Sequence, residues 1–234
     1  MKILDVIKTA LFTKRCALCG EVVEVDETFC EDCKNPPVIT GEICKSCGCA
    51  IDDCSCKKNK NEYKQIISPF YYEDSVVKAI NSYKEREMLF IADYLSKEMC
   101  TAISKYYSDI NFDLITFVPL GELKHRTRGF NQSQLLAEKI GTQICVKTEE
   151  VIYKSRHTGT LHKNKSNVKR AAIVFGAYDV YEECKNEIVG KTILLIDDVK
   201  TTGSTLNECA KMLKIYGAKE VYALTASITK KKVK

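Results

Sequence analysis

The chain has 234 residues, is 45% hydrophobic, and carries 13 cysteines and a formal net charge of +5. This length and composition suit one α/β domain with a sizeable core plus a small second unit. No stretch approaches the roughly 18 uninterrupted apolar residues of a membrane span, so we expect no membrane insertion.

The chain begins with MKILDVIKTALFTKR, in which residues 3–12 predict a short amphipathic helix. Asp5 and Lys8 interrupt its apolar run, and no small-residue cleavage site follows, which argues against a secretory signal. We therefore expect a cytoplasmic protein with reduced thiols, in preference to a secreted disulfide-bonded domain.

Nine of the 13 cysteines lie within residues 16–56 and form two groups with paired spacing. Two cysteines separated by two residues can direct both thiolates to one tetrahedral ion from a single tight turn. About forty residues with few large apolar side chains cannot fold by burial alone, whereas bound zinc can hold them together. The spacing predicts two structural zinc sites, at Cys16, Cys19, Cys30 and Cys33, and at Cys44, Cys47, Cys54 and Cys56.

The spacing of the cysteines allows two alternatives. Cys49 is a ninth candidate ligand, and interleaved sites are an alternative to sequential ones. The cysteines then stop and aromatic residues begin, so we place the boundary between a zinc module, 1–60, and the main domain, 61–234.

The main domain alternates helical and strand patterns. Two helices are expected within 74–107, a buried strand at 113–120, and a helix at 131–141 that Gly141 ends. Strands are expected at 151–154, 173–178, 192–198 and 221–226. A further helix at 205–217 should direct Leu206, Cys209, Ala210 and Leu213 inward. Strands and helices in this order predict a mainly parallel sheet with helices on both faces.

Positive charge is concentrated in residues 121–170, which hold eleven Lys or Arg, four Glu and no Asp. All three histidines of the chain fall in the same segment. A solvated loop surface would explain this composition, but a site for an anionic ligand explains it better.

In the stretch ILLIDDVKTTGST, 193–205, an apolar strand is followed by two carboxylates and by a loop rich in hydroxyl side chains. Ligands in such sheets bind at the carboxyl ends of the strands, and a loop that opens a helix can bind phosphate. Because side chains alternate along a strand, Asp197 and Asp198 share one site only if Asp198 lies past the strand end. Two acceptors beside a phosphate loop suit a ribose 5-phosphate. Phosphate-binding motifs of ATPases and dinucleotide-binding proteins are absent from the sequence. The alternative is an ordinary turn with Ser204 or Thr205 as the helix N-cap.

Two segments resemble known families. LLIDDVKTTGSTL is similar to the phosphoribosyl pyrophosphate signature of type I phosphoribosyltransferases, and RTRGFNQSQLLA, 126–137, resembles a characteristic stretch of the ComF family of bacterial competence proteins. That family joins an N-terminal cysteine zinc module to a type I phosphoribosyltransferase-like domain. The resemblance implies the following roles. The ribose hydroxyls would be held by Asp197 and Asp198, and the 5-phosphate by Thr201, Thr202, Gly203, Ser204 and Thr205. The pyrophosphate would be approached by Pro119, Leu120 and Gly121. The same site would be lined by Arg126, Arg128, Asn131, Gln132 and Arg170.

The chain departs from the family in the segment before the strand expected at 173–178. His162 stands where a glutamine is usual and Ile173 where an asparagine is usual, while Arg170 fits the pattern. This departure leaves the expected ligand site intact. It therefore favours a protein that binds the ligand over one that catalyses phosphoribosyl transfer.

Three functions follow as alternatives. The resemblance favours an accessory protein of DNA uptake and natural transformation that binds phosphoribosyl pyrophosphate with Mg²⁺. Its other expected partners are single-stranded DNA and a DNA-uptake helicase or other competence proteins. The second alternative is an active phosphoribosyltransferase of nucleotide salvage. The third is an interaction module with a vestigial site, which the intact acids and glycine of 197–205 argue against.

Overall fold

The computed structural model describes residues 13–56, 61–85, 88–155 and 176–230. The helix expected at 3–12 and the residues Arg170, His162 and Ile173, for which the sequence made predictions, lie outside these ranges.

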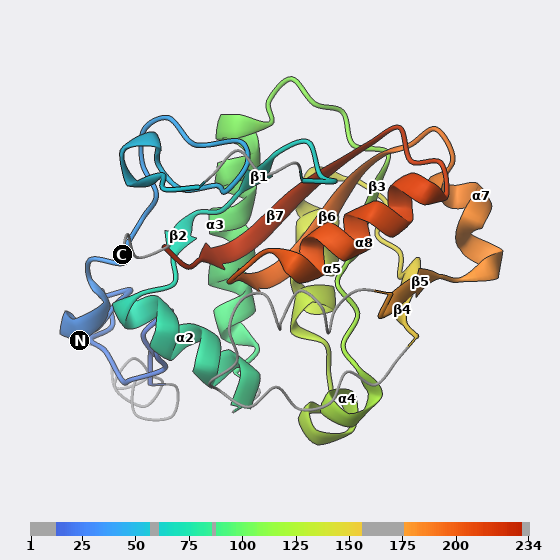
Figure 1. The fold of residues 1–234 in the computed structure, drawn as a ribbon. Coiled ribbons are helices and arrows are strands. Elements are labelled where there is room, and N and C mark those ends of the chain that lie inside the picture. The colour runs from blue at the N-terminus through green and yellow to red at the C-terminus, as the bar shows by residue number, and fades with distance from the viewer. Residues whose placement is uncertain (1–12, 57–60, 86–87, 156–175, 231–234) are drawn as a thin grey trace.

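A parallel sheet forms the centre of the molecule (Figure 1). Its strands run in the order β1-β7-β6-β3, and β2 also pairs with β7, every pair being parallel. The bounds are β1 Ile66–Ile67, β2 Phe70–Tyr71, β3 Leu114–Phe117, β6 Thr192–Lys200 and β7 Glu220–Ile228. The expected parallel sheet is therefore confirmed.

Helices cover both faces of the sheet, as the alternation of apolar residues in β6 requires. Leu194 and Ile196 pack toward α3 and α5, and Ile193 and Leu195 pack toward α8. Figure 1 shows α8 in front of the sheet with α3 and α5 behind it. The helices are α2 Asp74–Glu85, α3 Phe90–Tyr106, α4 Glu122–Arg128, α5 Gln132–Ile144, α7 Lys185–Ile188 and α8 Ser204–Ile215. Leu206, Cys209, Ala210 and Leu213 of α8 are buried, as expected.

Smaller elements complete the described chain. β4 (Ile152–Lys154) and β5 (Tyr178–Val180) form a separate antiparallel ribbon. Short 3-10 turns lie at η1 Glu31–Cys33, η2 Ile51–Asp53 and η3 Glu182–Cys184. Of the strand expected at 173–178, residues 173–175 lie outside the described ranges; Gly176 adopts a φ of +68° in a turn, and β5 begins at Tyr178.

The expected end of a helix at Gly141 is also wrong, because α5 continues to Ile144 and Cys145 caps it with a φ of +56°. Gly141 has a packing role. A Cβ at this position would lie 2.1 Å from Thr148 Oγ1 and 2.8 Å from the Val146 carbonyl oxygen. The glycine therefore permits the chain after α5 to fold back tightly onto the helix.

The cysteine-rich front end packs against the main domain. Cys16, Leu18 and Cys33 belong to the same buried cluster as α2 and α3. The Val38 region meets β2, since the Ile39 N–H donates to the Pro69 carbonyl at 2.8 Å. Within the described residues, no helix is long and apolar enough to cross a lipid bilayer.

Candidate functional site

Two carboxylates lie side by side near the end of β6. The Asp198 N–H donates to Asp197 Oδ1 at 2.9 Å, and the Val199 N–H donates to Asp198 Oδ1 at 2.6 Å. The condition that Asp198 lies past the strand end is wrong, because β6 continues to Lys200. The two acids nevertheless interact, since the charge of Asp198 acts on Asp197, and each carboxylate accepts from the next backbone N–H of the strand.

The carboxylates differ in their partners. Asp198 Oδ2 lies 2.5 Å from Lys84 Nζ of α2, and these side chains are only 14% and 21% exposed. Asp197 Oδ1 accepts from the Ser133 hydroxyl at 3.0 Å. Burial raises the pKa of Asp198, but the Lys84 charge and hydrogen bond outweigh it and the net pKa is lowered. Burial, and then the neighbouring charge of Asp198, raise the pKa of Asp197 to about 7.

Three more cations lie on this side of the sheet: Lys124 and Arg128 act on the acids, and Lys154 lies beside Lys124. Lys124 and Arg128 lie on α4, which begins after the turn 119–121, and Lys154 lies on β4. Partial burial and the charges of Arg128 and Lys84 lower the pKa of Lys124. Burial and the charge of Lys124 lower the pKa of Lys154, whose Nζ would lie 3.5 Å from a Cβ at Gly121. The cations are therefore close enough to repel one another, which an anionic ligand would relieve.

The loop between β6 and α8 is the expected phosphate site. Thr201, Thr202 and Gly203 form the loop, and Ser204 and Thr205 open α8. Gly203 is the N-cap with a φ of +80° and no side-chain cap bond, so the alternative of a Ser204 or Thr205 cap is wrong. The Thr202 and Ser204 hydroxyls lie 2.9 Å apart. The first N–H groups of a twelve-residue helix thus stand beside two hydroxyls, a geometry that suits an anion.

The other expected site residues divide into two groups. Arg128 donates to Gln132 Oε1 at 3.3 Å, and the charge of Arg128 lowers the pKa of Asp198, so Arg128 lies near the acids and Gln132 orients it. The Asn131 side chain instead bonds to backbone groups: it donates to the Val118 carbonyl at 3.1 Å and accepts from the Ser133 N–H at 3.0 Å. Arg126 is exposed on α4. Asn131 therefore positions α5 against the turn after β3.

Sequence reasoning missed four residues of this site: Lys84, Lys124, Ser133 and Lys154. Lys124 and Lys154 belong to the basic segment, so their charge was a signal, but their position was not. Ser133 stands in the quoted stretch 126–137. Lys84 lies at the end of an ordinary amphipathic helix, and nothing in its local sequence marks it.

The eight predicted cysteine ligands form two sequential groups, which settles the question of interleaving. In each group the four sulfur atoms lie within 4.8 Å of one another. Four thiolates at about 2.3 Å from one tetrahedral zinc would lie roughly 3.8 Å apart. Neighbouring sulfurs at 3.5 Å (Cys19–Cys30) and 3.6 Å (Cys47–Cys54) fit that ion. Cys49 is buried beside Cys47 but is outside the group of four.

Comparison with known families agrees with both parts of the chain. Residues 130–232 match the phosphoribosyl transferase domain, and residues 7–62 match the double zinc ribbon domain. The chain is 28% identical to the competence protein ComFC of Bacillus subtilis, over 82% of this chain and 80% of that one. It is 26% identical to the DNA utilization protein YhgH of Escherichia coli (88% and 86%), and 25% identical to competence protein F of Haemophilus influenzae (90% and 95%).

Solved structures with a related arrangement include an adenine phosphoribosyltransferase from Thermoanaerobacter pseudethanolicus. It is 13% identical, with a TM-score of 0.39, over 67% of this chain and 87% of that one. A glutamine phosphoribosylpyrophosphate amidotransferase from B. subtilis is 20% identical, with a TM-score of 0.38, over 58% and 26%. The parallel sheet and the domain match identify the type I phosphoribosyltransferase fold, preceded by a zinc ribbon module.

Proposed function

We propose the function of this chain from the premise that it belongs to the ComF family, in which a double zinc ribbon precedes a phosphoribosyltransferase-like domain. Relatives named for competence and DNA utilization match over most of its length, which supports a role in DNA uptake. Within that role, we propose that the chain binds phosphoribosyl pyrophosphate at the end of β6.

One observation carries the ligand proposal: two hydrogen-bond acceptors, a helix-opening loop and several cations meet at the same end of the sheet. Asp197 and Asp198 would accept from the ribose hydroxyls, and residues 201–205 would hold the 5-phosphate. Lys124 and Lys154 lie at the turn 119–121, where the pyrophosphate would approach. The ribose hydroxyls would then donate to carboxylates, and the phosphate groups would be bound by N–H groups, hydroxyls and ammonium groups.

The described residues do not fit a Mg²⁺ ion held by the two carboxylates. Lys84 already pairs with Asp198, the pKa of Asp197 is raised to about 7, and further cations stand nearby. A divalent ion at these acids would have to displace an ammonium group from a mostly buried pair. We therefore propose Mg²⁺ only as a companion of the pyrophosphate group of the ligand.

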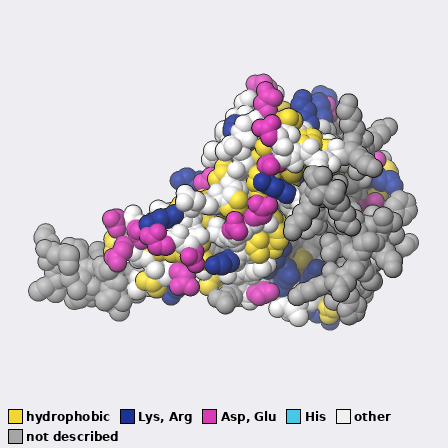
Figure 2. Space-filling model, turned by 60° about the vertical axis from the view of Figure 1, so that its left-hand side comes forward, with side chains coloured by type: hydrophobic (Ala, Val, Ile, Leu, Met, Phe, Trp, Pro, Cys, Tyr) yellow, Lys and Arg dark blue, Asp and Glu magenta, His cyan; other side chains and the backbone are white. Residues whose placement is uncertain are grey.

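For single-stranded DNA, we propose the basic surface of α4 and not the zinc module. Residues 13–56 contain four Lys or Arg against nine Asp or Glu, and zinc-bound thiolates add further negative charge. Figure 2, which brings the side of the zinc module forward, shows acidic side chains prominent on that face. The polyanionic backbone of DNA would be repelled there.

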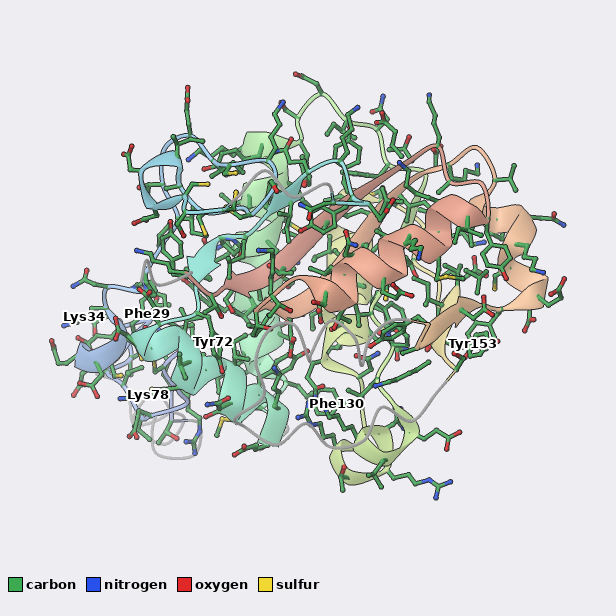
Figure 3. All side chains as sticks on the ribbon, in the orientation of Figure 1. Phe29, Lys34, Tyr72, Lys78, Phe130 and Tyr153 are labelled. Carbon is green, nitrogen blue, oxygen red and sulfur yellow. The ribbon has the colours of Figure 1, made fainter. Side chains whose placement is uncertain are left out.

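Aromatic stacking contributes little to this proposed surface. Phe130 packs against Tyr83 with ring centroids 5.7 Å apart, and Tyr153 packs against Tyr181 at 4.9 Å. Figure 3 shows Phe130 near α4 and Tyr153 at the β4–β5 ribbon, on separate parts of the molecule. Binding to DNA should therefore be mainly electrostatic, weak in sequence preference and sensitive to salt.

An active phosphoribosyltransferase of nucleotide salvage remains the second candidate, because the described ligand site has the parts that transfer also requires. Both candidates place the protein in the cytoplasm, where thiols stay reduced. A DNA-uptake helicase or other competence proteins are the proposed protein partners.

Calorimetric titration of the zinc-loaded protein with phosphoribosyl pyrophosphate, with and without Mg²⁺, tests the ligand proposal. Product analysis with a panel of bases then separates the two candidates. Saturable binding with no product supports the accessory role, and formation of nucleotide and pyrophosphate supports the transferase. The absence of binding in a folded sample would overturn both.

A further inference from the structure

The second cysteine group lies against the loop that would hold the 5-phosphate. Tyr63 connects the two: its hydroxyl donates to the Ser46 carbonyl at 3.3 Å, and Ser46 lies between Cys44 and Cys47. The same hydroxyl would lie 3.5 Å from a Cβ at Gly203. Tyr63 is 4% exposed, so its ring is fixed between the cysteine turn and the loop.

A second connection reaches the first turn of α8. The Glu62 N–H donates to Asn207 Oδ1 at 2.8 Å. The neighbouring Asn61 Nδ2 donates to the carbonyl and the hydroxyl of Ser46 at 2.8 and 3.0 Å. Residues 61–63 are therefore tied to the cysteine turn on one side and to the loop and helix on the other.

The start of the loop is also attached to this group. Lys200, the last residue of β6, is 6% exposed and lines a small cavity of about 10 Å³ together with Cys47, Cys49 and Cys56. Its Cε would lie 3.2 Å from a Cβ at Gly203. The start of the loop 201–203 therefore borders the second cysteine group through Lys200, and its end lies against Tyr63 and the Lys200 side chain.

The first cysteine group has different neighbours. Phe29 packs on Tyr94 of α3 with ring centroids 5.2 Å apart, and Asp32 pairs with Lys78 of α2 at 3.4 Å. Figure 3 shows Phe29 and Lys78 together at the α2 side of the molecule. The two zinc sites of one chain therefore provide a matched comparison.

We infer that zinc in the second group orders the loop 201–204, with Tyr63 and Asn207 as positioning residues that transmit its effect. This inference rests on the proposed function only for the identity of the ligand. Zinc fixes the turn that carries Ser46, because residues 44–56 have little apolar core of their own. Without the metal, Asn61 and Tyr63 lose their fixed partner Ser46, and the loop is no longer ordered before the ligand binds. The free energy needed to order it is then subtracted from the binding free energy, so affinity falls.

The test compares three variants with the wild type. Cys54→Ser removes a ligand of the second zinc, and Cys19→Ser removes a ligand of the first that is half-buried like Cys54. The double variant Tyr63→Phe, Asn207→Ala keeps both zinc sites and the Lys200 contact but removes the hydrogen bonds made by Tyr63 and Asn207, so it remains informative if Cys54→Ser does not fold. Three quantities are measured on each: zinc content, amide hydrogen exchange of residues 200–207 without ligand, and affinity for phosphoribosyl pyrophosphate.

The inference predicts faster exchange in the loop and roughly tenfold weaker binding for Cys54→Ser and for the double variant, the equivalent of one lost hydrogen bond. Cys19→Ser should exchange in the loop and bind as the wild type does. Adding zinc to the wild type after chelation should restore slow exchange. A double variant that matches the wild type in both loop exchange and affinity would overturn the inference.

The exchange readout separates this inference from the proposed function. Loop exchange that follows the second zinc, in a protein that binds no phosphoribosyl pyrophosphate, supports the coupling and refutes the ligand. If the protein binds phosphoribosyl pyrophosphate but hydrogen exchange in the loop is the same with and without the second zinc, the coupling is refuted and the proposed ligand is supported.

Discussion

Replacement of Asp197 by asparagine should weaken ligand binding while making the protein more stable at pH 8. As a ligand residue, the carboxylate would accept charge-assisted hydrogen bonds from ribose, each worth about 1.5–3 kcal/mol. Their loss corresponds to a decrease in affinity of roughly tenfold to a hundredfold. Calorimetric titration and a melting curve on the same sample measure both effects.

The stability gain follows from the raised pKa of Asp197, about 7 against an ordinary 3.8, which burial and the Asp198 charge cause. The folded protein holds this proton more tightly than the unfolded chain, so stability falls as pH rises from about 4 to 7. Each pKa unit corresponds to about 1.4 kcal/mol. Because asparagine is still a buried polar group, we expect a gain on the order of 2 kcal/mol at pH 8. For a protein of this size that is about 4–8 °C in Tm.

Asp198→Asn is the matched control, since it removes the neighbouring carboxylate with the same change of shape. It leaves the Lys84 ammonium without its partner at 2.5 Å, so Tm should decrease, contrary to a simple relief of like charges. Unchanged affinity in folded Asp197→Asn protein would refute the ligand role, and a lower Tm at pH 8 would refute the electrostatic argument.

Three further predictions concern the metal, the basic surface and the packing of α5. Elemental analysis should find about two zinc ions per chain, and about one in Cys30→Ser; a folded protein without zinc would contradict the two sites. Arg126→Glu with Arg128→Glu should weaken single-stranded DNA binding equally for all sequences and reduce its salt dependence; unchanged affinity would place the surface elsewhere. Gly141→Ala should destabilise the fold by about 1–3 kcal/mol in denaturant titrations, because its Cβ would lie 2.1 Å from Thr148 Oγ1; an unchanged midpoint would show that the turn can relax.

Patterns that depend on near neighbours in the chain were predicted well from the sequence. Cysteine spacing identified both groups of four, because a tight turn brings such pairs together wherever the chain folds. Apolar periodicity identified α2, α3, α8 and the buried strands β3, β6 and β7, but not the two-residue strands β1 and β2. Glycines were less reliable: Gly141 marked close packing inside a helix and not the end of one, and local sequence does not distinguish these cases.

The sequence by itself determined the parts of the candidate site: two acids at a strand end, a loop of hydroxyls and a basic segment. Tertiary structure decided how they are arranged. Ser133 meets Asp197 across 64 positions, and Glu62 meets Asn207 across 145. Such pairs form only when the sheet and its helices bring distant segments together, so their identity depends on packing and not on any local pattern. The same packing gives the two neighbouring aspartates opposite pKa shifts, because burial dominates at Asp197 while Lys84 forms its ion pair and hydrogen bond with Asp198 and acts on Asp197 only through its charge.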